Sequence, residues 1–130
     1  MKSRVAEVGR LVALTGRVIA WALAVVIVLL SGVPADLRPV TDMPHEFEHF
    51  AIFLATGIAF GFGYCRRPFA VAVMLFLFAG MIEIAQVFVP DRHARLSDFV
   101  VDALAVCAGA TLGAAVGRMV AQTLPRQAAH

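Results

Sequence analysis

Charged residues are scarce in this sequence. Only 15% of its 130 residues are charged, whereas 61% are hydrophobic. A soluble domain of this size has too small a core to bury so much apolar surface. The composition therefore argues against an ordinary soluble protein and predicts an integral membrane protein.

Cysteine is also rare, and Cys65 and Cys107 are the only two. We expect no disulfide between them, because Cys65 follows one apolar stretch and Cys107 lies inside another, and two cysteines at this spacing form no zinc motif. A nucleic-acid-binding motif is missing too, and the net charge of +2 comes from basic residues spread along the flanks of apolar stretches. We therefore expect membrane lipids as partners, no nucleic acid and no cofactor.

The apolar residues gather in four stretches, which predict four transmembrane helices. The second stretch is short, so its polar start must lie at the membrane interface, whereas Pro90 ends the third. The first is expected to be retained, because "SGVPADLRP" after it offers no clean small-x-small cleavage site. The predicted fold class is all-α, a compact polytopic bundle forming one domain over residues 1–130. The expected helices cover residues 12–33, 46–64, 69–89 and 98–120.

The basic residues predict the orientation of these helices. Four spans place both termini on one side, and the terminal segments together with the "CRRP" loop hold eight of the eleven basic residues. The positive-inside rule then puts both termini in the cytoplasm and residues 34–49 and 90–98 outside. The eight residues are Lys2, Arg4, Arg10, Arg17, Arg66, Arg67, Arg118 and Arg126.

Acidic residues and histidines gather on the opposite, outer side. Eight of the nine acidic residues and three of the four histidines fall in the outer loops or the outer halves of the helices. This one-sided gathering suggests that binding or chemistry takes place at the outer face. The residues are Asp36, Asp42, Glu46, Glu48, Glu83, Asp91, Asp98 and Asp102, with His45, His49 and His93.

Helical spacing places several of these groups on packing faces. Asp98 and Asp102 are one turn apart on a stripe that continues through small residues, and His45 and His49 begin a similar stripe on the second helix. Glycines four residues apart let helices approach closely, so we favour close packing inside the bundle over a dimer interface, and the oligomeric state stays open. The glycines of the two stripes are Gly57, Gly61, Gly109, Gly113 and Gly117.

Glu83 is the hardest polar residue to explain as a structural one. It lies seven residues before Pro90, roughly 10 Å along the helix axis. Inserting a carboxylate at the bilayer centre costs about 2.5–3.5 kcal/mol, so such residues usually face the interior of a bundle and have a partner there. The candidate partners of Glu83 are Arg92 and Arg95. Asp98, by contrast, suits a helix N-terminus as well as a ligand role.

Motifs in this sequence resemble the VanZ-like family, small bacterial membrane proteins named after a protein of glycopeptide-resistance clusters, and the later motifs are the more specific ones. The family pattern is D-K-x-x-H-F entering one helix, E-x-x-Q near the end of the next, then a proline, an arginine, an aspartate and an asparagine. The resemblance covers about residues 44–117. The matching residues are His49, Phe50, Glu83, Gln86, Pro90, Arg92 and Asp98.

Two positions depart from the family pattern. His45 and Glu46 stand where the family has Asp and Lys, and Asp102 replaces the asparagine. The resemblance implies a bacterial inner-membrane protein with a role in the cell envelope, such as susceptibility to the glycopeptide teicoplanin.

The main hypothesis is an outward-facing polar pocket that binds a zwitterionic or phosphorylated lipid head or a lipid-linked cell-wall precursor. Arginine would bind the phosphate. The pocket residues are His49, Glu83, Gln86, Arg92, Asp98 and Asp102.

Two alternatives remain. "HEFEH" matches H-E-x-x-H, so His45, Glu46 and His49 could serve a membrane-embedded zinc-dependent hydrolase. We do not favour a metal there, because the resemblance accounts for only one of the histidines and four spans leave little chain for a substrate cleft. The second alternative is a structural or assembly subunit that binds a larger partner through the glycine stripes.

Overall fold

The computed structural model describes residues 2–33, 45–89 and 96–123, with the side chains of residues 7–33, 47–89 and 96–123. Within these ranges the chain forms four helices and no strands. They are α1 (Lys2–Gly32), α2 (His45–Gly63), α3 (Pro68–Gln86) and α4 (Leu96–Thr123). The predicted all-α fold is therefore confirmed.

Three of the helices are long and apolar enough to cross a membrane. The qualifying segments are Glu7–Gly32, Pro68–Gln86 and Leu96–Thr123, with mean hydropathies of 2.3, 2.2 and 2.0. The apolar part of α2, Phe47–Gly63, is shorter. Large apolar side chains such as Trp21, Phe69 and Met81 lie exposed on the bundle surface, as expected when lipid is the solvent. These are the features of a helical membrane protein.

Three helix ends differ by three residues or more from the boundaries expected from the sequence, and one of them is the end of α4, which lies at Thr123 and not at residue 120. α1 begins at Lys2, ten residues before the expected start, because no proline interrupts this segment and its residues support a helix beyond the most apolar part. α3 ends at Gln86, three residues early. The backbone N–H groups of Val87, Phe88 and Val89 each donate to the carbonyl three residues before, which is a tighter winding than the α-helix, and Pro90 follows.

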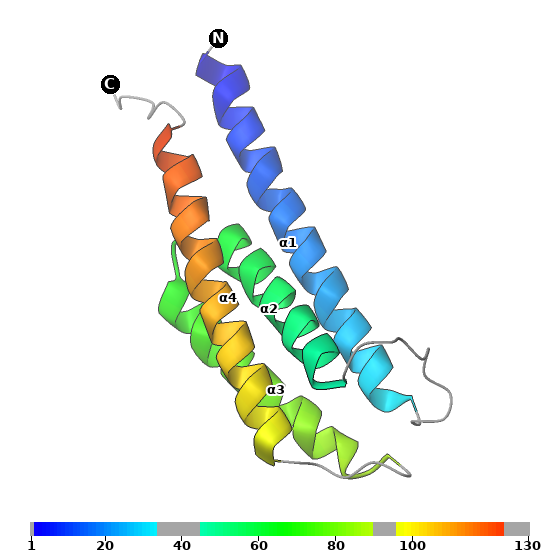
Figure 1. Ribbon diagram of the computed structural model, residues 1–130. Coiled ribbons are helices and arrows are strands. Elements are labelled where there is room, and N and C mark those ends of the chain that lie inside the picture. Colours follow the sequence, from blue (N-terminus) through cyan, green and yellow to red (C-terminus); the bar gives the residue numbers. More distant parts are fainter. Residues whose placement is uncertain (1, 34–44, 90–95, 124–130) are drawn as a thin grey trace.

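The helices alternate in direction, and α2 lies at the centre of the arrangement (Figure 1). α2 packs most extensively against α4, and its other main neighbour is α1, whereas α3 packs mainly against α4. Because α3 reverses the chain between them, α2 and α4 run parallel. α1 begins and α4 ends at the same end of the bundle.

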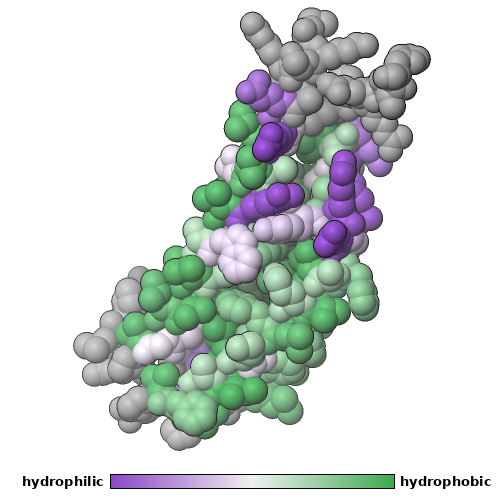
Figure 2. Space-filling model, turned by 180° about the vertical axis from the view of Figure 1, so that it is seen from behind, coloured by the Kyte–Doolittle hydropathy of each residue, from purple (hydrophilic) through white to green (hydrophobic). Residues whose placement is uncertain are grey.

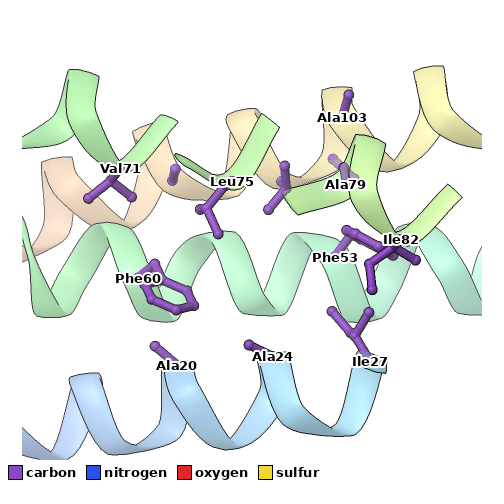
Figure 3. Packing of buried hydrophobic residues seen from close by; sticks show 13 residues of the cluster. Ala20, Ala24, Ile27, Phe53, Phe60, Val71, Leu75, Ala79, Ile82 and Ala103 are labelled. Atoms are coloured by element: carbon purple, nitrogen blue, oxygen red, sulfur yellow. The ribbon is translucent and has the colours of Figure 1, made fainter. Parts of the chain in front are cut away.

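The hydrophobic core follows α2 along its length (Figure 3). Small residues of α1, Ala20 and Ala24, lie against the helix that carries Phe60, and α3 contributes apolar side chains from the other side. Phe53 and Ile82 belong to this core near the end where α2 begins. The core therefore borders the polar residues His49 and Glu83, which lie next along their helices.

Charge is divided between the two ends of the bundle. Hydrophilic residues gather toward the end where α1 begins, and most of the remaining visible face is apolar (Figure 2). We call this the arginine end; its described arginines, all exposed, are Arg10, Arg17, Arg66, Arg67 and Arg118. The opposite end, here called the carboxylate end, carries Glu48, Glu83, Asp98 and Asp102.

Candidate functional site

The site is built on a very close contact between α2 and α4. Gly57 and Gly61 of α2 lie directly on the backbone of α4: a methyl group added at Gly61 would meet the Ala110 carbonyl oxygen and stand 2.8 Å from its carbon. On α4, Gly109 and Gly113 face the carbonyl oxygens of Leu54 and Ile58 in the same way. The two backbones therefore touch without intervening side chains, which holds α2 and α4 in a defined register.

The same seam extends to both helix ends. Toward the arginine end, a methyl group at Gly117 would stand 2.9 Å from the Phe62 carbonyl oxygen. Near the middle, the Thr56 hydroxyl is fully buried and donates to the Ile52 carbonyl at 2.7 Å, so this polar group is satisfied within its own helix. Five glycines predicted to serve helix packing thus all lie between α2 and α4.

At the carboxylate end the seam brings His49 and Asp102 together. His49 Nδ1 lies 3.2 Å from Asp102 Oδ2. The side chain of Asp102 is 1% exposed and that of His49 is 13% exposed. With the hydrogen on Nδ1, the imidazole donates to the carboxylate. A histidine and an acid from two helices therefore form a pair inside the bundle.

Aromatic packing holds the histidine in place. The His49 ring stacks on Phe53, with centroids 6.2 Å apart and an interplanar angle of 25°. Phe53 is itself buried and lies against Phe78 of α3, with centroids 6.4 Å apart. The imidazole is thus supported from the core side.

One oxygen of Asp102 is left over after this pairing. Its second oxygen, Oδ1, is buried and has no hydrogen-bond partner among the described residues. An unsatisfied buried acceptor costs about 1–3 kcal/mol, and more when it is charged. Such a residue in a membrane bundle is a functional-site candidate, because a helix that only packs would not need it.

α3 carries two more buried polar residues. Glu83 is 8% exposed and Gln86 is 5% exposed, and both lie on the packed face of α3 together with Ile82. In the described part of the chain, Gln86 Nε2 has no hydrogen-bond partner. An amide donor and a carboxylate are therefore held inside the bundle on α3. From the sequence alone, Glu83 was the polar residue that a structural role explained least well.

Asp98 lies one turn before Asp102, in a different environment. It occupies the first turn of α4, is partly exposed, and accepts a hydrogen bond from Ser97 Oγ at 3.1 Å. A carboxylate in this place is stabilised by the positive end of the helix dipole. The sequence left two roles open for Asp98, one at a helix N-terminus and one as a ligand. The geometry fits the first of these roles. Arg92, the remaining predicted pocket residue, lies outside the described residues.

The structure does not test the zinc hypothesis, which stays a prediction. The side chains of His45 and Glu46 lie outside the described ones, and His49 Nδ1 faces Asp102. Among the described residues, no three His, Cys, Asp or Glu side chains are grouped so that they could hold a metal.

A second interhelical cluster, formed by Arg17, Trp21 and Tyr64, was missed from the sequence. Trp21 Nε1 donates to the Tyr64 hydroxyl at 3.1 Å, and the Arg17 guanidinium lies 4.8 Å from the centroid of the Tyr64 ring. Arg17 Nε also donates to the Gly63 carbonyl at 2.9 Å. The four-residue spacing of Arg17 and Trp21 on one face of α1 was the signal available for this cluster. It ties α1 to the end of α2 by satisfying one of the helix's last carbonyls.

Comparisons of the chain with protein-family models, with curated proteins and with solved structures found no match. The function is therefore inferred from the residues of the site.

Proposed function

We propose that this chain is a VanZ-like protein of the bacterial inner membrane that binds the polar head of a lipid-linked cell-envelope component at its carboxylate end. Binding there would influence susceptibility to glycopeptides such as teicoplanin. The observation that carries the proposal is the His49–Asp102 pair, in which a carboxylate oxygen is buried without a hydrogen-bond partner among the described residues.

The proposed topology has four spans, with both termini in the cytoplasm. The five exposed arginines of the arginine end support this orientation through the positive-inside rule. α2 has 19 residues, which extend about 28 Å at 1.5 Å per residue. That length is slightly less than a hydrocarbon core of about 30 Å, and the apolar part of α2, Phe47–Gly63, stands at the short end of the range for transmembrane helices. The proposal therefore places the polar first turn of α2 at the interface. The carboxylate end then faces away from the cytoplasm.

The chemistry of the site suits a head group that carries both hydrogen-bond donors and a phosphate. Asp102 Oδ1 accepts hydrogen bonds from hydroxyl or ammonium groups, and Gln86 Nε2 donates to a carbonyl or phosphate oxygen. Arg92, which follows α3 in the sequence, is the proposed phosphate ligand, since guanidinium groups bind phosphate in a bidentate manner.

The proposal is tested by complementation of a deletion strain. Asp102→Asn keeps the size of the side chain but removes its charge, and His49→Gln keeps a polar group but removes the imidazole. We expect both variants to accumulate at wild-type levels in the membrane and to leave teicoplanin susceptibility as in the deletion strain. Glu7→Gln, which removes an exposed carboxylate at the arginine end, should complement fully. Full complementation by the two site variants would contradict the proposal.

A further inference from the structure

An open groove runs between α1 and α2, away from the His49–Asp102 pair. Its volume is about 600 Å³, within the range of sites that bind small molecules. α1 forms one wall with Leu11, Thr15 and Ile19, and α2 forms the other with Ala55, Ile58 and Phe62. The small side chain of Ala55 is exposed, so the groove is open to a molecule beside the helices.

The groove lacks polar groups that need a partner. Its lining side chains are apolar except for Thr15, whose hydroxyl donates to the Leu11 carbonyl of its own helix at 3.0 Å. A molecule that lies in the groove therefore gains contact with apolar surface and need not supply hydrogen bonds. A hydrocarbon chain has this chemistry.

One end of the groove reaches the arginine end of the bundle. Arg17 of α1 is level with the last residue of α2, because its Nε binds the Gly63 carbonyl, and Leu11 lies almost two turns further toward that end. Arg10 directly precedes Leu11. On the α4 side, Gly117 packs on the backbone of Phe62, so the exposed Arg118 lies near the same end.

We propose that this groove holds one acyl chain of an anionic phospholipid, whose phosphate lies among the arginines of the arginine end. Charge complementarity selects this occupant, because the described side chains at this end include five arginines and only Glu7 as an acid. Basic residues between membrane helices are a known means of recruiting anionic lipids. A second copy of the chain in the same orientation would instead place arginines against arginines.

The test uses the full-length protein in mild detergent, incubated with phosphatidylglycerol or with phosphatidylcholine of identical acyl chains, and counts bound lipid by native mass spectrometry. We expect retention of phosphatidylglycerol to exceed that of phosphatidylcholine by about fivefold for each arginine that contacts the phosphate. The double variant Arg66→Gln, Arg67→Gln, which neutralises two exposed arginines after α2, should reduce this preference without changing phosphatidylcholine retention.

Groove-filling variants test the acyl-chain part of the site. Ala55→Phe fills the groove from α2, and Ile19→Trp fills it from α1; both positions are exposed. We expect each to lose most of the retained phosphatidylglycerol. Ala108→Phe is the matched control, because Ala108 is exposed on α4 and does not line the groove, and it should retain lipid as the wild type does.

Three results would overturn the proposal. They are equal retention of the two lipids by the wild type, wild-type retention by a folded groove-filling variant, and a dimer that the groove-filling variants dissociate. Helicity is measured for each variant by circular dichroism, and if Ala55→Phe fails to fold, Ile19→Trp decides the outcome.

Discussion

A methyl group at Gly61 is the smallest change that tests the contact between α2 and α4. The added Cβ would meet the Ala110 carbonyl oxygen and stand 2.8 Å from its carbon and 2.9 Å from its Cα, whereas ordinary contacts lie at 3.4–4 Å. Because these are backbone atoms, no rotamer change can relieve the clash. α2 and α4 must move apart by at least about 0.6 Å to bring the carbonyl carbon of Ala110 to 3.4 Å from the added Cβ, and a gap of about 0.5–1 Å forfeits a quarter to a half of the dispersion energy of a contact.

The net cost follows from two opposing effects. Overpacking of a well-packed interior costs about 1–3 kcal/mol. Replacing glycine by alanine within a helix returns about 0.5–1 kcal/mol through backbone entropy and helix propensity. We therefore expect Gly61→Ala to lower the free energy of unfolding by about 2 kcal/mol. This value takes the overpacking cost near its upper limit, because the clash involves three backbone atoms.

Unfolding in a titration of sodium dodecyl sulfate, followed by circular dichroism in mild detergent, measures this effect. Gly80→Ala is the matched control, because it also lies within a helix but its added methyl would meet only Phe99 Cε2, at 3.5 Å. We expect Gly80→Ala to be neutral or stabilising by up to about 1 kcal/mol. The double variant Gly61→Ala, Gly113→Ala should cost less than the sum of its parts, since the first substitution already separates the helices. Equal stabilities of Gly61→Ala and Gly80→Ala would refute the close contact.

Three further predictions concern other parts of the chain. Cys65, in the connection after α2, should react with a membrane-impermeant maleimide in inside-out vesicles and not in intact spheroplasts; the reverse pattern would overturn the proposed topology. Arg17→Ala should destabilise the protein by about 1–2 kcal/mol, because it removes a hydrogen bond and the contact with the Tyr64 ring, whereas Arg10→Ala, at an exposed position without a described side-chain contact, should be neutral. His45→Ala should leave the zinc content of the purified protein unchanged, and loss of a stoichiometric zinc ion would favour the hydrolase alternative.

The glycine seam was the part of the fold most accessible from the sequence. Small residues at four-residue spacing identify a face on which a helix backbone can approach another, and Gly57 and Gly113 indeed lie at such a contact. Spacing alone does not give the register between two helices. The sequence therefore placed Asp98 and Asp102 on one stripe but did not distinguish their roles. In the structure, Asp102 pairs with His49, whereas Asp98 lies in the first turn of α4.

Features that depend on the ends and crossings of helices were less accessible. The start of α1 at Lys2 was missed because hydropathy marks the apolar part of a helix rather than its full length. The contact of Arg17 with Tyr64 joins α1 to the residue after α2, and the spacing of Arg17 and Trp21 marks one face of α1 without indicating which residue that face contacts. The groove between α1 and α2 depends on how the side chains of the two helices pack beside each other, which the sequence pattern does not specify.

The account is tested most directly by binding of a lipid-linked cell-wall precursor at the His49–Asp102 pair. The wild type, Asp102→Asn and the control Glu7→Gln would be titrated with this precursor in nanodiscs. We predict that Asp102→Asn weakens binding by at least about tenfold, because hydrogen bonds to a charged group contribute about 1.5–3 kcal/mol, and that Glu7→Gln binds as the wild type does. Equal binding by the wild type and a folded Asp102→Asn variant would contradict a ligand-binding role for this pair.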